Sequence, residues 1–232
     1  MRLSIISGLA FVSSLANGAS AQALALWDFN DSNLTADFLS VGVTGTASNI
    51  GGTTATFATG FGSNAGSAWN TTGYPSSTSS PKTAGVEFSY SFSDATVADD
   101  LVFKFDIRHS NTSANKEVVL GSLDGNSWVE LASFSFTPAA TGTSDTWYPR
   151  NLNLTALGDS PSSSLKIRVV SDFGTDTSYL ASRSTSTYGT IGTWRFDNVE
   201  LAFVVPVPEP STWALFGAGV IGLAFVVRRK NK

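Results

Sequence analysis

Apolar and polar side chains alternate along most of the chain between residues 24 and 205, as expected of strands that bury one face. The alternation is clearest over residues 86–92 and 101–107, where the apolar residues of each segment share one parity. Helical periodicity is almost absent from this region. We therefore predict an all-β fold, a two-sheet antiparallel β-sandwich of jelly-roll type.

Weaker patterns complete the expected sandwich. Asp124-Gly125-Asn126-Ser127 separates two apolar segments and predicts a hairpin turn. Two stretches rich in Ser and Thr, residues 70–83 and 172–192, are predicted as long polar loops. The remaining strands are expected at residues 24–29, 38–43, 118–123, 128–136, 152–154, 165–169 and 194–203, with a weak one at 55–61.

The last predicted strand contains a change of phase. Its large apolar residues occupy even-numbered positions up to Phe196 and odd-numbered positions from Val199 onward. A β-bulge at Asp197-Asn198 would restore a single buried face along the whole strand. Bulges often redirect side chains, so this carboxylate and this amide become candidates for a site.

The C-terminal stretch contains an uncharged apolar run, residues 213–227. With Ser211 and Thr212 it would form a helix of about 26 Å, against a hydrocarbon core of about 30 Å. A basic tail, residues 228–232, follows at once, and the positive-inside rule places it in the cytoplasm. We predict a transmembrane helix at about residues 211–227, with the preceding domain on the other side of the membrane.

The N-terminus has the features of a secretory signal peptide, residues 1–21. Arg2 supplies the positive charge, an apolar segment follows, and small residues precede a cleavage point after Ala21 or Ala23. Both ends of the chain therefore predict export, with processing by signal peptidase.

The order of parts at the C-terminus resembles a known sorting signal. Residues 206–232 combine a Pro-Glu-Pro motif, a short apolar run and a terminal basic cluster, as PEP-CTERM sorting signals do. The resemblance implies transient insertion in the inner membrane, removal of the tail by an exosortase, and delivery to the cell envelope, cell surface or extracellular matrix of an exopolysaccharide-producing bacterium. The plainer alternative is an ordinary transmembrane anchor. The residues that carry the resemblance are Val207, Pro208, Glu209, Pro210, Ser211, Arg228, Arg229 and Lys230.

Composition limits the function of the remaining domain, residues 22–205. The chain has no cysteine, which excludes disulfides and cysteine-based metal sites. The domain carries 9 basic and 17 acidic side chains, a net charge of −8. Nucleic-acid binding requires a clustered basic face, so we expect no nucleic-acid partner.

Oxygen-bearing side chains near the two ends of the domain could bind a structural calcium ion. If the first and last strands are neighbours, the loop after the first strand would approach the bulge of the last one. Calcium takes six to eight oxygen ligands. The alternative is that these residues only form a turn and satisfy the bulge amide. The candidate ligands are Asp28, Asn30, Asp31, Asp197 and Asn198.

Aromatic residues in or beside predicted loops could stack on sugar rings. We expect Trp27, Trp128 and Trp194 to lie in the core. The ending Trp-x-Phe-Asp-Asn-Val-x-Leu, residues 194–201, looks similar to extracellular carbohydrate-binding jelly-roll modules at the level of the fold. The candidate sugar-binding residues are Trp69, Tyr74, Trp147, Tyr148, Tyr179 and Tyr188.

Catalysis has little support in the sequence. The single histidine, His109, follows a strand next to Ser110, but no nucleophile elbow is present, and we expect this histidine to be solvated. The sequence predicts an exported, non-catalytic protein that binds or organises extracellular polysaccharide. A structural matrix or adhesion protein without a defined ligand is the alternative, and a glycan-active enzyme is a third interpretation.

Overall fold

The computed structural model describes residues 20–62, 66–97, 101–136 and 146–205. One compact unit, Ala21–Val204, contains almost all of these residues. The predicted transmembrane helix and sorting signal lie outside the described residues, as does the predicted signal peptide up to residue 19. In the part of the chain that is described, no helix is long and apolar enough to cross a membrane.

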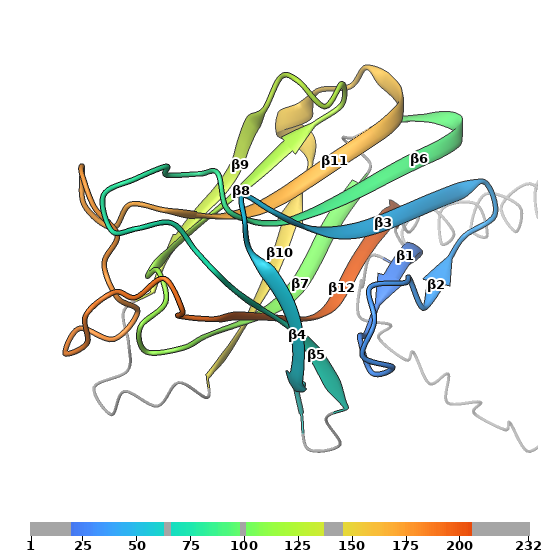
Figure 1. The fold of residues 1–232 in the computed structure, drawn as a ribbon. Coiled ribbons are helices and arrows are strands. Elements are labelled where there is room, and N and C mark those ends of the chain that lie inside the picture. The colour runs from blue at the N-terminus through green and yellow to red at the C-terminus, as the bar shows by residue number, and fades with distance from the viewer. Residues whose placement is uncertain (1–19, 63–65, 98–100, 137–145, 206–232) are drawn as a thin grey trace, which may run out of the picture. The chain divides into compact units, whose positions relative to one another are not determined.

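The unit is a sandwich of two antiparallel sheets, as the alternating pattern predicted (Figure 1). The five-stranded sheet has the order β3 (Val43–Ile50), β6 (Gly85–Val97), β11 (Pro161–Asp172), β8 (Lys116–Ser122) and β9 (Val129–Ser135). The path of the seven-stranded sheet is β10 (Trp147–Asn153), β7 (Leu101–His109), β12 (Trp194–Val205), β1 (Ser20–Trp27) and β2 (Phe38–Leu39). The hairpin of β4 (Thr54–Thr59) and β5 (Ser67–Thr72) joins this sheet through β5 and β12. One short 3-10 helix, Thr155–Leu157, follows β10.

The last strand, β12, is the centre of the seven-stranded sheet. It pairs with β7 along one edge. On its other edge β5 covers its first residues, Trp194–Phe196, and β1 is the neighbour further along the strand. The first and last strands are therefore neighbours, which meets the condition set for the calcium hypothesis.

The predicted bulge in β12 is confirmed as well. The pairing with β7 shifts register between Asp197 and Glu200, and Asn198 has a φ angle of +48°. Because of the extra residue, the apolar side chains before and after the bulge face the same way. Phe196 and Val199 are therefore both fully buried. The bulge lies where the neighbour of β12 changes from β5 to β1.

Alternation within each strand sends large aromatic side chains into the space between the sheets. Trp27 and Trp194 are fully buried, as expected, and Trp27 contacts the ring of Phe88 at 5.5 Å between centroids. The prediction for Trp128 is wrong. It is half-buried and lies beneath the guanidinium of Arg168, 3.8 Å from the ring centre.

Two strands form where the sequence predicted loop or a different boundary. Residues 38–43 give a two-residue strand and then a turn, after which β3 runs to Ile50 through a segment rich in Gly, Thr and Ser. The start of the predicted loop at residues 70–83 belongs to β5. Both β3 and β5 are built mostly from small side chains, so pairing with β6 and β12 defines them better than their own pattern does.

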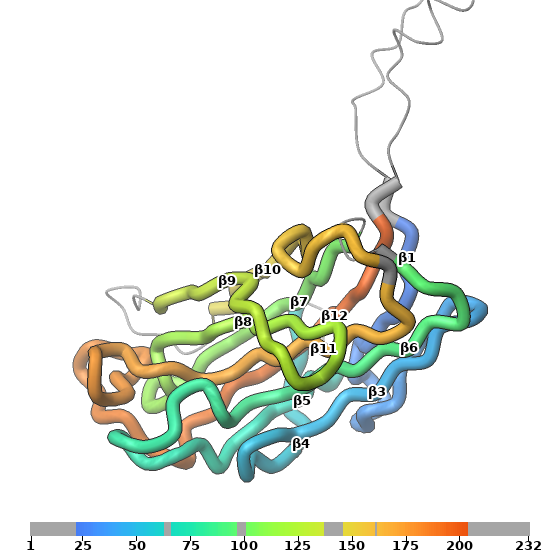
Figure 2. Tube along the Cα trace, turned by 90° about the horizontal axis from the view of Figure 1, so that it is seen from above, coloured from blue at the N-terminus to red at the C-terminus, as the bar shows by residue number. Residues whose placement is uncertain are grey.

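The polar loops gather at one end of the unit. Residues 73–84 and 172–192 lie together at the end opposite the start of β1 and the end of β12 (Figure 2). Backbone hydrogen bonds join the two loops, from Tyr179 to Ser77 and from Tyr74 to Thr190. These contacts make the loops one ordered surface.

Candidate functional site

Three of the six candidate sugar-binding aromatics are core residues. Trp69 is in β5, is 0% exposed and packs against Phe196. Tyr74 is buried against Trp194 and hydrogen-bonds to the hydroxyl of Thr71 at 2.6 Å. Tyr179 is also buried. The prediction of exposed rings is therefore wrong for these three, because the segments that carry them turn the rings into the core.

Tyr148 and Tyr188 are half-buried and have structural contacts. Tyr188 stacks on Tyr179 at 4.9 Å and donates a hydrogen bond to the carbonyl of Pro75, which ties the two polar loops together. Tyr148 points inward from β10 and packs against Phe136. These two rings stabilise the loop end and offer little free surface.

Trp147 is the candidate that faces outward on a sheet. It lies opposite Arg108 of β7, which lies opposite Arg195 of β12. Arg195 in turn lies opposite Asn70 of β5, and Asn70 lies opposite Thr56 of β4. These five residues, which we call the outer row, therefore form one line across five strands on the outer face of the seven-stranded sheet.

Hydrogen bonds hold much of the outer row in place. Asn70 donates to the hydroxyl of Thr56 at 3.0 Å and accepts from Nε of Arg195 at 3.4 Å. Arg195 also donates through Nη1 to the carbonyl of Thr59 at 2.9 Å. The Arg195 guanidinium is thus held against the β4–β5 hairpin.

Trp147 of the outer row forms an aromatic pair with Phe61. Phe61, in the loop after β4, is 47% exposed and contacts Trp147 edge to face at 5.8 Å. Its backbone N–H donates to Oδ2 of Asp197 at 2.6 Å. The bulge carboxylate therefore fixes the loop residue that completes the aromatic pair. The two arginines of the outer row also line a hollow of about 70 Å³, together with Ser110 and Thr193.

The structure brings some, but not all, of the five candidate calcium ligands close together. Burial raises the pKa of Asp197, and the nearby charges of Asp106 and Asp28 raise it further. Asp28 and Asp31 instead accept backbone hydrogen bonds within their own loop, from Asn30 and Asn33.

The bulge amide also has a partner. The side chain of Asn198 donates to Asp106 at 2.9 Å. Over the described residues, no group of three or more His, Cys, Asp or Glu is placed to hold a metal ion. The turn and bulge roles are thus observed, and calcium binding stays a prediction.

His109 is not solvated, contrary to expectation. It is buried, because its position in β7 shares the core-facing parity of Ile107. Its Nε2 lies 3.5 Å from Oε2 of Glu117, which is fully buried and accepts a hydrogen bond from Nε of Arg150. We call His109, Glu117 and Arg150 the buried charged cluster. It joins the two sheets, because Glu117 belongs to β8 and the other two to β7 and β10.

Ser182 lies close to His109 of this cluster, but it is buried and therefore is not an accessible nucleophile. Nδ1 of His109 donates to the carbonyl of Ala114 at 3.2 Å, and Ser182 lies 3.4 Å from the same nitrogen. The Ser182 hydroxyl also hydrogen-bonds to the carbonyl of Ala114, and it is buried. Burial lowers the pKa of His109, against the opposing effect of Glu117. These contacts fit a structural role.

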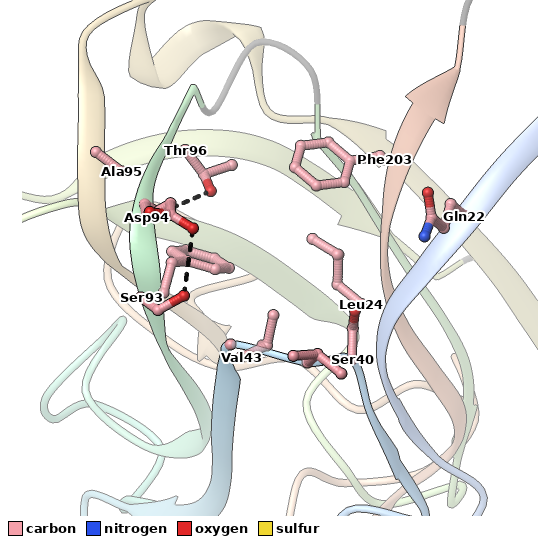
Figure 3. Close-up of a pocket in the computed structure, with 12 residues that line it drawn as sticks. Gln22, Leu24, Ser40, Val43, Ser93, Asp94, Ala95, Thr96 and Phe203 are labelled. Carbon is pink, nitrogen blue, oxygen red and sulfur yellow. Dashed lines mark hydrogen bonds between the residues drawn. The ribbon is translucent and has the colours of Figure 1, made fainter.

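A cavity of about 440 Å³ lies at the end of the unit where β1 begins and β12 ends. Leu24 and Phe203 face Ser93 and Asp94 across it (Figure 3). Its lining includes none of the residues that the sequence singled out for sugar or calcium binding.

Sequence reasoning missed both the outer row and the buried charged cluster. The parity of β7 and β8 carries a signal for the cluster, since His109 and Glu117 share the inward face of their strands. The outer row depends on the register of five strands that are distant in sequence. A single strand's pattern contains no such information.

A sequence search finds no curated protein with significant similarity to this chain. Among solved structures, a family 29 carbohydrate-binding module is 11% identical, with a TM-score of 0.38 over 80% of this chain and 89% of that one. A xylan-binding domain from Paenibacillus barcinonensis is 12% identical, with a TM-score of 0.43 over 82% and 99%. An arabinose-bound arabinofuranosidase is 13% identical, with a TM-score of 0.42 over 79% and 27%. Similarity at this level transfers neither a site nor an activity.

The C-terminus gives a specific match. Residues 206–230 match the PEP-CTERM protein-sorting motif, and a signal of this class implies export through the membrane to the cell envelope or surface. The chain thus carries a PEP-CTERM protein-sorting motif at residues 206–230, behind an all-β sandwich domain.

Proposed function

We propose that this exported protein binds polysaccharide on the outer face of its seven-stranded sheet and so organises extracellular polysaccharide around the cell. The observation that supports this proposal is the contact of Trp147, the aromatic member of the outer row, with Phe61. Aromatic rings offer a flat apolar surface to a sugar ring, and neighbouring amide and guanidinium groups can hydrogen-bond to its hydroxyls.

The rigidity of this surface favours binding. Asn70 and Arg195 are held by hydrogen bonds to the β4–β5 hairpin, and Phe61 is held by Asp197. Groups that are already ordered lose less conformational entropy when a ligand arrives. The site also lies on strands, which position side chains more closely than loops do.

Binding of the full-length chain, purified in detergent, to a panel of neutral and acidic polysaccharides by affinity electrophoresis tests the proposal. Trp147→Ala is expected to weaken binding of a retained polymer about 5- to 30-fold, because truncating an aromatic anchor costs about 1–2 kcal/mol. Trp128→Ala is the matched control, since Trp128 is also half-buried but lies directly before β9 of the five-stranded sheet.

Equal retardation of the Trp147→Ala and Trp128→Ala variants would contradict the proposed face. Failure of the wild-type chain to bind any polymer would instead favour the alternative, a structural matrix or adhesion protein without a defined ligand. The described residues give no positive support for an enzyme. His109 and Ser182, which lie next to each other in the fold, are both buried.

Processing belongs to the same proposal. The sorting motif implies an exosortase as a partner, and we expect signal peptidase to act at the N-terminus. The protein recovered from the host envelope should then lack both the signal peptide and the C-terminal apolar run. Intact mass spectrometry measures this directly, and a mass that includes residues 213–227 would contradict tail removal.

A further inference from the structure

A pocket of about 360 Å³ lies at the loop end of the unit. Loop 172–192 supplies most of its described lining, and Asn115, directly before β8, and Phe136, directly after β9, complete it. Pockets for small molecules have volumes of about 300–1,000 Å³, so this one has room for a single small ligand. Its described lining contains no member of the outer row, so a ligand here would be independent of that face.

Backbone hydrogen bonds hold the walls of this pocket in place. The N–H of Asn115 donates to the carbonyl of Leu180 at 2.9 Å, and the N–H of Phe136 donates to the carbonyl of Asn115 at 2.6 Å. Further along the loop, the N–H of Arg183 donates to the carbonyl of Asn111 at 3.0 Å. A pocket whose walls are already ordered loses less conformational entropy when a ligand binds.

Arg183 lines the pocket and differs from the other basic residues of the domain. Most of the 9 basic side chains have carboxylate partners, and the two arginines of the outer row also have interactions within the protein. Among the described residues, Arg183 has no ion-pair partner, and its guanidinium donates no hydrogen bond. The basic residues with carboxylate partners are Lys82, Lys104, Lys116, Arg150, Lys166 and Arg168.

The position of Arg183 favours an anionic ligand. A fully exposed arginine needs no partner, because water solvates it, but Arg183 is half-buried in the wall of a pocket. The domain has a net charge of −8, so carboxylates are abundant on its surface, yet none of the described ones pairs with this cation. An anion that enters the pocket would supply the missing partner.

Other polar groups of the lining are also free to bind a ligand. The hydroxyls of Ser184 and Ser186 form no hydrogen bond with any described residue. The amide oxygen of Asn115 is enclosed and has no partner in the described part of the chain, which leaves the amide nitrogen as the accessible donor. Such groups can bind the hydroxyls of a sugar, while the apolar side chains of Phe136 and Leu180 can pack against its ring.

We propose that this pocket, which we call the loop pocket, binds a single acidic sugar unit whose carboxylate pairs with Arg183. The guanidinium supplies paired, charge-assisted hydrogen bonds to the carboxylate, and the serine hydroxyls and the Asn115 amide bind the hydroxyls of the ring. The site goes beyond the proposed function, because it is separate from the outer row and selects its ligand by charge.

Three small ligands test the loop pocket. Galacturonate has a carboxylate on a sugar ring, galactose has an alcohol in place of that carboxylate, and acetate has a carboxylate without a ring. We expect the full-length chain, in a detergent without a sugar headgroup, to bind galacturonate about tenfold more tightly than either of the others, because a charge-assisted hydrogen bond is roughly twice as strong as a neutral one. Titrations followed by saturation-transfer NMR measure the three affinities.

Substitutions locate the site. Arg183→Gln should lower the affinity for galacturonate to that for galactose, and its thermal melt should match that of the wild type, because the side chain has no partner among the described residues. Lys166→Gln is the matched control, since it removes the same charge from β11, where the side chain is 40% exposed, and should leave the preference intact. Ser184 is an exposed residue of the lining, and Ser184→Trp should fill the pocket and abolish galacturonate binding.

Each outcome decides one part of the proposal. Equal wild-type affinity for galacturonate and galactose would overturn recognition of the acid, and equal affinity for galacturonate and acetate would overturn recognition of the sugar. Wild-type affinity in Arg183→Gln or, if that variant does not fold, in Ser184→Trp would overturn the location. If galacturonate does not bind at all, the loop pocket is overturned, while the polymer assay of the outer face still decides the proposed function by itself.

Discussion

At the scale of single residues, the buried charged cluster is the feature with the largest energetic consequence. Glu117 is fully buried between the sheets, and the guanidinium of Arg150 both hydrogen-bonds to it and lies 4.0 Å from the centre of the Phe134 ring. A buried carboxylate is stable only if a partner compensates its loss of hydration. Arg150 therefore matters more for stability than an exposed arginine does.

Removing one member of this pair should be costly. Arg150→Met leaves Glu117 buried without its cation, and we expect the free energy of unfolding to fall by about 3–5 kcal/mol. The double variant Glu117→Leu/Arg150→Met should recover much of this loss, because it removes the stranded charge. Urea unfolding of the four forms gives the coupling energy, and additive effects would contradict the pairing.

The lowered pKa of His109 predicts acid sensitivity. The unfolded chain binds a proton near the ordinary value of 6.5, while burial keeps the folded form neutral to lower pH. The contribution of this residue to stability is thus complete above pH 6.5 and is lost as the pH falls toward the folded pKa, by up to about 1.4 kcal/mol per pH unit.

This pH dependence can be assigned to His109 with one variant. The difference in unfolding free energy between wild type and His109→Gln should change between pH 7 and pH 5, because only the wild type loses the contribution of the histidine. Other titrating groups cancel in the difference. A difference that is constant over this range would contradict the assignment.

At the scale of elements, strands with large alternating side chains were predictable, and strands built from small polar residues were not. Residues 86–92 and 101–107 correspond to β6 and β7 because each has an apolar face that only burial can satisfy. The β5 segment, SAWNTT, has a single large apolar side chain, and pairing with both β4 and β12 defines it. This also explains why Trp69 was assigned to a loop.

The bulge of β12 predicts a strict residue preference. Asn198 has a φ of +48°, which glycine and asparagine adopt readily and β-branched residues do not. Asn198→Val should cost about 2–3 kcal/mol, through backbone strain and loss of the hydrogen bond to Asp106. Asn198→Gly should cost about 1 kcal/mol, through loss of that hydrogen bond alone.

A control separates the bulge from a general effect of valine. Asn151 is exposed in β10 and has no positive φ, so Asn151→Val should change the unfolding free energy by less than about 0.5 kcal/mol. Urea unfolding compares the three variants. Equal costs for Asn198→Val and Asn198→Gly would show that φ does not limit this position.

At the scale of the whole molecule, some long-range relations could be predicted and others could not. The first and last strands are neighbours, as the calcium hypothesis required. The outer row was not expected, because it depends on the registers of four strand pairs at once. The residues of the candidate site therefore come together only when the sheet is assembled.

Calcium binding is a prediction for the assembled domain. If an ion joins the loop after β1 to the bulge of β12, added Ca²⁺ at about 100 times its dissociation constant should stabilise the fold by about 2.7 kcal/mol, a shift of several degrees in Tm. Asp28→Asn should abolish the shift, and Asp176→Asn, an exposed carboxylate in the loop 172–192, should not. Identical melts with Ca²⁺ and with chelator would contradict this prediction.

The neighbouring positions of β1 and β12 also set an order of events in time. β12 provides the contacts that connect β7, β5 and β1, so the seven-stranded sheet stays in separate pieces until the last strand of the domain is available. Pairings between residues so distant in sequence form slowly. For a chain exported from its N-terminus, we expect this delay to keep the preceding residues unfolded during translocation. The sorting motif begins at residue 206, directly after β12, so folding would be completed only as the sorting signal itself reaches the membrane.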